Sequence, residues 1–166
     1  CLDPKRDWKE LLACAENPDL RFIVSNTTEA GIAFDPVCGA EDTPPASFPA
    51  KLTAFLYRRF QVGLPGFWIL PCELIDYNGR NLEECCMKTA EQWGLSEEFK
   101  TWLKTENVFC STLVDRIVTG YPKAEAEDLG RELGYEDRLL DTGELFGAWI
   151  VEAPESLARE LPFEKA

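Results

Sequence analysis

The sequence predicts an α/β protein, the second half of a doubly wound, mainly parallel sheet with helices on both faces. Short apolar segments alternate with segments of helical periodicity, in the order β-α-β-α-α-β-α-β-α. The expected strand over 67–74 is apolar on both faces, which is typical of a sheet covered by helices on both sides. Strands separated by helices require crossovers, and crossovers join parallel strands.

The first part of the chain contains two of these strands. The expected elements are a helix over 7–15, a strand over 20–26, a proline-rich loop over 35–49, a helix from Ser47 to Gln61 and a strand over 67–74. The hydroxyl of Ser47 is a suitable N-cap for the second helix. We expect Pro71 to mark the end of the second strand, because proline cannot donate a ladder hydrogen bond.

The second part continues the alternation. The expected elements are a turn over 76–79 leading into a helix closed by Gly94, a short helix capped by Ser96, a strand over 107–114, a helix from Pro122 to Gly134, a strand over 146–152 and a terminal helix from Pro154. A complete doubly wound sheet has further strands, which we expect before residue 1. The chain begins with Cys1 and ends at Ala166 without a closing signal, so we interpret residues 1–166 as one domain cut from a longer protein.

Charge and cysteine content narrow the class of function. The net charge of −13 predicts no binding to nucleic acid or to an anionic membrane surface. Residues 123–166 carry 12 acids and 5 bases. A solvated acidic face is the simpler interpretation, and a docking surface for a basic partner is the alternative. Seven cysteines without a C-x-x-C pair indicate reduced thiols of a cytoplasmic protein. We expect no membrane span and no metal site.

Histidine is absent from the sequence, so no Ser-His-Asp or Cys-His catalytic site can lie within this chain. The remaining candidates are three segments at expected strand ends, namely 25–31, 72–79 and 111–116. Open α/β sheets bind ligands at the carboxyl ends of their strands. Each segment also has a structural interpretation: Asn26 and Thr28 could cap a turn, Glu73 could pair with Arg80, and Asp115 with Arg116 could form structural ion pairs. We interpret Asn78-Gly79 as an ordinary turn.

Five stretches of this sequence resemble the polyol-specific long-chain dehydrogenases, the family of mannitol dehydrogenase and the hexuronate reductases. They are residues 21–32, 47–53, 72–79, 109–122 and 132–137. The fourth, Phe-Cys-Ser-Thr-Leu-Val-Asp-Arg-Ile-Val-Thr-Gly-Tyr-Pro, is long enough to be specific. The likeness covers nearly the whole chain and is closest to the hexuronate reductases.

The resemblance implies a Rossmann-like fold, the cofactor NAD and a small hexuronate or aldonate substrate. The implied reaction is the NADH-dependent reduction of D-tagaturonate to D-altronate and its reverse. A glycine-rich phosphate loop is expected before Cys1. The catalytic lysine, with its partner asparagine and histidine, is expected on a helical domain after Ala166. No catalytic residue is then expected in this chain, and the missing parts of the parent chain would be its partners.

The resemblance also assigns site residues. Asn26, Thr28, Glu29 and Glu73 are expected to bind the cofactor, and the Thr28-Glu29 loop is expected to line its nicotinamide side. Asp115 is expected to bind a substrate hydroxyl. Hydride transfer leaves negative charge on the carbonyl oxygen, and an ionised aspartate cannot donate a proton to it. Arg116 has the bidentate geometry that suits a substrate carboxylate, although it could equally orient Asp115 or anchor the fold.

One position departs from the mannitol dehydrogenases, in which an asparagine helps to hold the reacting oxygen. Leu74 stands at that position and cannot donate the hydrogen bond, which favours the hexuronate branch. The sequence leaves two alternatives open. The first is a fructuronate reductase or a mannitol-type dehydrogenase, and the second is a non-enzymatic α/β domain that binds a ligand or a partner. The choice between NAD and NADP also stays open.

Overall fold

A computed structural model of the chain describes residues 1–165. Its sheet contains β1 (Phe22–Ser25), β2 (Trp68–Pro71) and β3 (Val108–Phe109), in that order and all parallel. Phe22 lies opposite Trp68, and Trp68 lies opposite Val108. The expected α/β class with a parallel sheet is confirmed, and β2 ends at Pro71 as the sequence predicts.

The helices follow the predicted order. They are α1 (Trp8–Ala13), the 3-10 helix η1 (Cys14–Glu16), α2 (Phe48–Gln61), α3 (Asn78–Gln92) and α4 (Glu97–Thr105). The two predicted caps are confirmed: Ser47 Oγ accepts from the Ala50 amide at 3.3 Å, and Ser96 Oγ accepts from the Phe99 amide at 3.3 Å. Each cap satisfies an amide that the first turn of the helix leaves unpaired.

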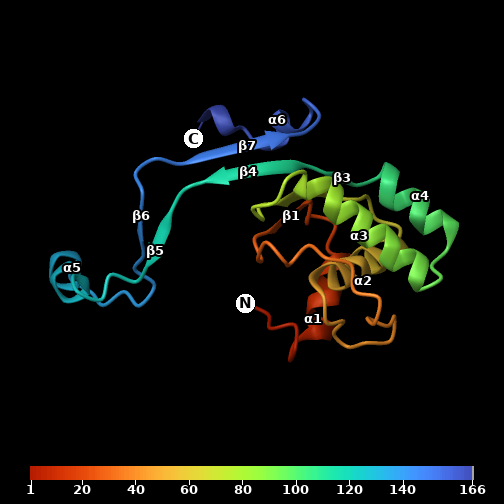
Figure 1. Cartoon of the computed structure of the whole chain (residues 1–166), viewed down its shortest axis with the longest axis horizontal. Coiled ribbons are helices and arrows are strands. Elements are labelled where there is room, and N and C mark those ends of the chain that lie inside the picture. The colour runs from red at the N-terminus through yellow and green to blue at the C-terminus, as the bar shows by residue number, and fades with distance from the viewer. Residues whose placement is uncertain (166) are drawn as a thin grey trace. The chain divides into compact units, whose positions relative to one another are not determined.

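One face of the sheet packs against α2, α3 and α4 (Figure 1). The sheet contributes Ile69, and Phe67 just before β2 is buried beside it. The helices contribute apolar side chains at helical spacing. The buried helix residues of this cluster are Leu52, Phe55, Leu56, Leu82, Cys85, Cys86, Ala90, Phe99 and Leu103. Burial of each large side chain stabilises the fold by about 1.5–3 kcal/mol.

The opposite face is covered by the end of the chain. Leu157 of α6 (Leu157–Glu160) is buried with Leu70 and Cys110, and Trp68 and Val108 pack against them. The chain then forms the 3-10 helix η2 (Phe163–Lys165). Helical segments therefore lie on both faces of the sheet, as the sequence predicts.

The prediction of one strand over 107–114 is wrong. The parallel ladder ends at Phe109, and β4 (Ser111–Asp115) instead forms a two-stranded sheet with β7 (Ala148–Glu152). The physical reason is that β2 has already ended, so the Thr112 amide donates to the side chain of Asn78 at 2.8 Å. The strand expected over 146–152 exists as β7, but its partner is β4 rather than the parallel sheet.

The chain divides into two compact units. The first contains residues 1–113 and 151–166, and the second contains residues 114–150. The second unit includes β5 (Val118–Gly120) and β6 (Thr142–Gly143), which pair antiparallel and were not predicted, and α5 (Ala126–Leu133). Gly134 ends α5 with a left-handed φ of 78°, a conformation that favours glycine.

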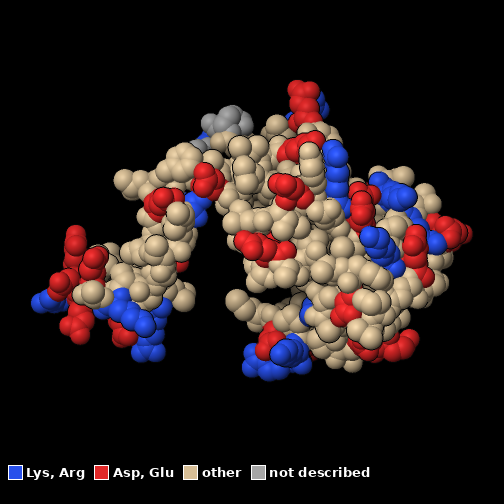
Figure 2. Space-filling view, viewed as in Figure 1, with Lys and Arg blue, Asp and Glu red and all other residues tan. Residues whose placement is uncertain are grey.

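Charged side chains of both signs are intermixed on the face that Figure 2 shows. Within residues 1–165, no helix is long and apolar enough to cross a membrane. The same residues contain no group of three or more His, Cys, Asp or Glu side chains that could hold a metal ion.

Candidate functional site

The loops that leave β1 and β2 lie at the same edge of the sheet, because the two strands are parallel and Ser25 lies opposite Pro71. These loops form a cavity of about 310 Å³. It is lined by Asn26, Thr27, Thr28, Glu29, Glu73 and Leu74. The structure thus brings together the four residues for which the sequence predicts cofactor binding.

The loop after β1 makes a tight turn over residues 27–31. The Gly31 amide donates to the Thr28 carbonyl at 2.8 Å. A Cβ atom at Gly31 would lie 2.0 Å from Thr27 Oγ1, so only glycine allows the chain to fold back this closely. The turn presents Thr28 and Glu29 to the cavity.

The carboxylate of Glu73 holds this turn against β2. Glu73 is only 2% exposed, and its two oxygens accept from Ser25 Oγ at 3.0 Å and from the amide and hydroxyl of Thr27 at 3.0 and 2.9 Å. A buried carboxylate needs such donors, and hydrogen bonds to a charged group are the stronger kind. Direct contact between Glu73 and a cofactor stays a prediction.

The pairing of Glu73 with Arg80, which the sequence left open, does not form. Arg80 instead lies 3.7 Å from Glu152, and its guanidinium is 5.1 Å from the ring of Tyr77. Both groups of the Arg80–Glu152 pair are about two-thirds exposed, so the pair adds little stability.

Asn78 is the residue that the sequence analysis missed. It is fully buried at the first position of α3, so its interpretation as an ordinary turn residue is wrong. Three carbonyls share the two protons of its Nδ2, those of Pro71 at 2.9 Å, Glu73 at 3.0 Å and Thr112 at 2.9 Å. Its Oδ1 accepts from the amides of Gly79 at 2.9 Å and Thr112 at 2.8 Å. The sequence signal for this packing is Gly79 in the first turn of α3, because a glycine lets another segment of the chain come close to the helix.

Asp115 and Arg116 belong to the second unit. Asp115 is exposed at the last position of β4. Arg116 is also exposed, and its guanidinium donates to the main-chain carbonyls of Phe146 at 3.1 Å and Leu145 at 3.3 Å. These bonds support its role in anchoring the 145–147 segment. The substrate contacts expected of Asp115 and Arg116 stay predictions.

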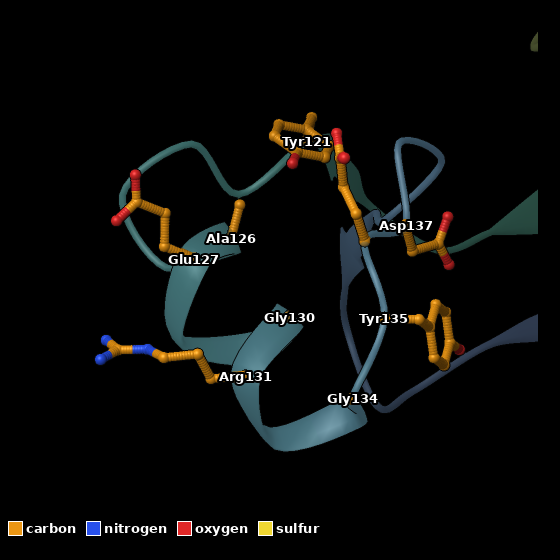
Figure 3. Close-up of a pocket in the computed structure, with 9 residues that line it drawn as sticks. Tyr121, Ala126, Glu127, Gly130, Arg131, Gly134, Tyr135 and Asp137 are labelled. Carbon is orange, nitrogen blue, oxygen red and sulfur yellow. The ribbon is translucent and has the colours of Figure 1, made fainter.

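A larger cavity, of about 770 Å³, lies within the second unit between α5 and the chain that follows it. Figure 3 shows Glu127 and Arg131 pointing to one side of this cavity, and Tyr135 and Asp137 pointing to the other. Gly130 and Gly134 also line the cavity. These four side chains do not converge on one point of the cavity, and the carboxylate of Glu136, which also lines it, pairs with Arg138 at 3.0 Å.

Comparison with known proteins identifies relatives over nearly the whole chain. The profile of the family described as the mannitol dehydrogenase Rossmann domain matches residues 2–165. Altronate oxidoreductase from Pectobacterium carotovorum is 51% identical over 164 residues, which is 96% of this chain and 34% of the relative. Altronate oxidoreductase from Yersinia enterocolitica is 50% identical over the same shares. The chain therefore spans about a third of the length of these relatives.

Solved structures show the same fold at lower identity. Pseudomonas fluorescens mannitol 2-dehydrogenase, in a ternary complex with NAD and D-mannitol, matches with a TM-score of 0.78 and 22% identity. That match covers 91% of this chain and 33% of the mannitol enzyme. A substrate-free D-sorbitol dehydrogenase matches with a TM-score of 0.72 and 22% identity, over 90% of this chain and 34% of the other.

Proposed function

Because this chain belongs to the mannitol dehydrogenase family through its Rossmann domain, we propose that it is part of an NAD-dependent oxidoreductase that interconverts D-tagaturonate and D-altronate. The observation that carries this proposal is identity of about half to altronate oxidoreductases across 96% of the chain. The sequence likewise resembles the hexuronate branch of the family at its strand ends.

The residues at the sheet edge fit one end of a dinucleotide. The cavity of about 310 Å³ is at the lower limit of known ligand sites, large enough for one ring system but not for a whole dinucleotide. It combines the amide of Asn26, the hydroxyl of Thr28 and the carboxylate of Glu29 with the exposed apolar side chain of Leu74. A nicotinamide, which has an apolar ring and a polar carboxamide, suits this mixture. No glycine-rich phosphate loop occurs in the sequence, so the phosphates would be held elsewhere in the parent chain.

The bound cofactor would supply or accept the hydride. The residues of this chain would position the reactants. Glu73 holds the Thr27 turn, and this would keep Thr28 and Glu29 in a fixed orientation toward the nicotinamide. Asp115 would accept a hydrogen bond from a substrate hydroxyl, since an ionised carboxylate is an acceptor only. The proton donor to the reacting oxygen would lie in a part of the parent outside these 166 residues, on a helical domain that follows them.

Leu74 supports the hexuronate branch over a mannitol-type substrate. Its side chain is 61% exposed at the rim of the cavity and offers no hydrogen bond to a reacting oxygen. A fructuronate reductase is the closest competing assignment, because it would use the same edge of the sheet and an isomeric substrate.

The test is a substrate panel with the complete enzyme, expressed from the full reading frame. We expect NADH oxidation with D-tagaturonate at a kcat/KM at least about tenfold above that with D-fructuronate or D-fructose, a difference of about 1.4 kcal/mol. Preference for D-fructuronate or D-fructose would assign a sibling activity. Absence of turnover with all three would contradict the proposal. The 166-residue chain alone should show no turnover, because the proposed proton donor and phosphate loop lie outside it.

A further inference from the structure

We propose that Asn78 is a positioning residue of this site, which holds the main chain of Glu73 so that the Glu73 carboxylate can orient the Thr27 turn. The inference rests on the proposed function, because it assigns Asn78 a part in presenting the 26–31 loop to the reactants. Asn78 itself does not line the cavity and would act only through Glu73.

Asn78 joins two segments that no backbone ladder joins. The exit of β2 is held through the carbonyls of Pro71 and Glu73, and the start of β4 is held through both the amide and the carbonyl of Thr112. The hydroxyl of Thr112 adds a second link, since it donates to the Pro71 carbonyl at 2.5 Å. On the side of β4 the end of β2 is therefore fixed by side chains, while on the side of β1 the Cys72 amide still donates to the Ser25 carbonyl at 2.7 Å.

Glu73 is consequently held at both of its ends. Its carbonyl accepts from Asn78 Nδ2 at 3.0 Å and from the nearby Ile75 amide at 2.9 Å, and its carboxylate accepts three bonds from Ser25 and Thr27. A rotation of the Glu73 main chain would carry the carboxylate away from the Thr27 amide and hydroxyl. The chain of contacts from Asn78 through Glu73 to Thr27 thus transmits the position of β2 to the turn that lines the cavity.

A second buried asparagine supplies a matched control. Asn107 is 6% exposed and lies just before β3, at the amino edge of the sheet. Its Oδ1 accepts from the Phe67 amide at 3.0 Å, and its Nδ2 donates to the carbonyls of Trp102 and Leu103, both at 3.3 Å. Asn107 shares the chemistry and burial of Asn78, but none of its partners belongs to the cavity.

The experiment compares Asn78→Asp with Asn107→Asp in the complete enzyme. Aspartate keeps the size of the side chain but replaces the amide donor with an oxygen that faces carbonyls. Both variants should lose thermal stability. At a temperature where both are fully folded, we expect Asn78→Asp to lower kcat by about tenfold to a hundredfold, the scale of a misplacement of about 1 Å. Asn107→Asp should stay within about twofold of the unsubstituted enzyme.

Amide hydrogen exchange supplies a readout that does not require turnover. The Thr27 amide, which donates to Glu73 Oε1 at 3.0 Å, should exchange at least about tenfold faster in Asn78→Asp than in Asn107→Asp. If Asn78→Asp fails to fold, Asn78→Ser removes the same amide with less repulsion, and the same two differences are expected of it.

The outcomes separate this inference from the proposed function. An enzyme that turns over no hexuronate would contradict the proposed function, while exchange at Thr27 would still decide whether Asn78 positions the turn. Equal effects of the Asn78 and Asn107 variants on both kcat and Thr27 exchange would overturn the inference and leave Asn78 with a structural role only.

Discussion

Gly79 lies so close to the connection between β3 and β4 that only a hydrogen atom fits. A Cβ atom there would lie 2.4 Å from the Cys110 carbonyl oxygen. Helix propensity alone favours alanine over glycine by about 1 kcal/mol. In this structure the clash with Cys110 outweighs that preference. We therefore predict that Gly79→Ala lowers the free energy of unfolding by about 1–3 kcal/mol.

Urea denaturation measures this change, and Gly39→Ala is the control. A Cβ at Gly39 would meet Asp42 Oδ1 at 3.5 Å, an ordinary contact, so that variant should be neutral or slightly stabilising. Gly79→Ala at or above the stability of the unsubstituted chain would show that α3 does not approach Cys110 so closely.

Arg59 is a buried cation that has no carboxylate partner among the described residues. It is 1% exposed, and its guanidinium donates to four carbonyls, those of Ala15, Asn17, Leu20 and Pro65, at 2.5–3.0 Å. The Cζ atom of the Arg59 guanidinium also lies 4.5 Å from the centre of the Phe67 ring. Burial lowers the pKa of Arg59 from its ordinary value. The side chain ties the end of η1 and the approach to β1 onto α2.

We predict that Arg59→Lys is strongly destabilising, because an ammonium cannot reach all four carbonyls. Each buried carbonyl left unpaired costs about 1–3 kcal/mol. The neighbouring Arg58 is half-exposed and pairs with Glu16 at 2.6 Å, so Arg58→Lys should cost less than about 1 kcal/mol. Similar losses for both variants in urea denaturation would contradict the account of Arg59.

At the scale of elements, the sequence predicts those held by local signals. The caps at Ser47 and Ser96 and the stop at Pro71 act through neighbouring residues, and all three lie where expected. The division between β3 and β4 could not be predicted, because it depends on Asn78, which lies 34 residues from its partner Thr112. The strands β5 and β6 are only 3 and 2 residues long, too short to show a hydrophobic period.

The second unit, residues 114–150, contains no buried residue, and this includes the helix α5. Segments with little buried apolar area open at low free-energy cost. We therefore predict that trypsin cleaves the isolated chain first within residues 114–150, after Lys123, Arg131 or Arg138. Mass spectrometry of the early products checks this prediction. First cleavage within α2 or α3 would contradict it.

At the scale of the whole molecule, buried thiols link stability to alkaline pH. Burial raises the pKa of Cys86 to about 12 and that of Cys110 to about 11. In the unfolded chain these thiols ionise near pH 8.5, at about their model-peptide value. Because the folded pKa is raised, their contribution to stability is complete below about pH 8.5 and is lost as the pH rises toward about 11 to 12.

The corresponding measurement is the free energy of unfolding by urea from about pH 7.5 to about pH 10. It should decline above about pH 8.5, and Cys110→Ala should show a shallower decline than the unsubstituted chain. Tyrosine and lysine also titrate in this range, so the difference between the two slopes is the informative quantity. Identical slopes would contradict the assignment to buried thiols.

The candidate site could be predicted only in part. The strand ends at Thr28, Glu29 and Glu73 were identified because parallel strands present their carboxyl ends together. Two features could not be predicted: the hydrogen bonds of the Glu73 carboxylate to the loop after β1, and the network around Asn78. Both depend on side-chain contacts between segments distant in sequence. The apolar rim at Leu74 was identified only through the family resemblance.

A crystal structure of the complete enzyme with NADH and D-altronate tests the central claim most directly. We predict that the nicotinamide ring contacts Thr28, Glu29 and Leu74, and that the Asp115 carboxylate accepts a hydrogen bond from a substrate hydroxyl. A nicotinamide bound away from the ends of β1 and β2 would contradict it.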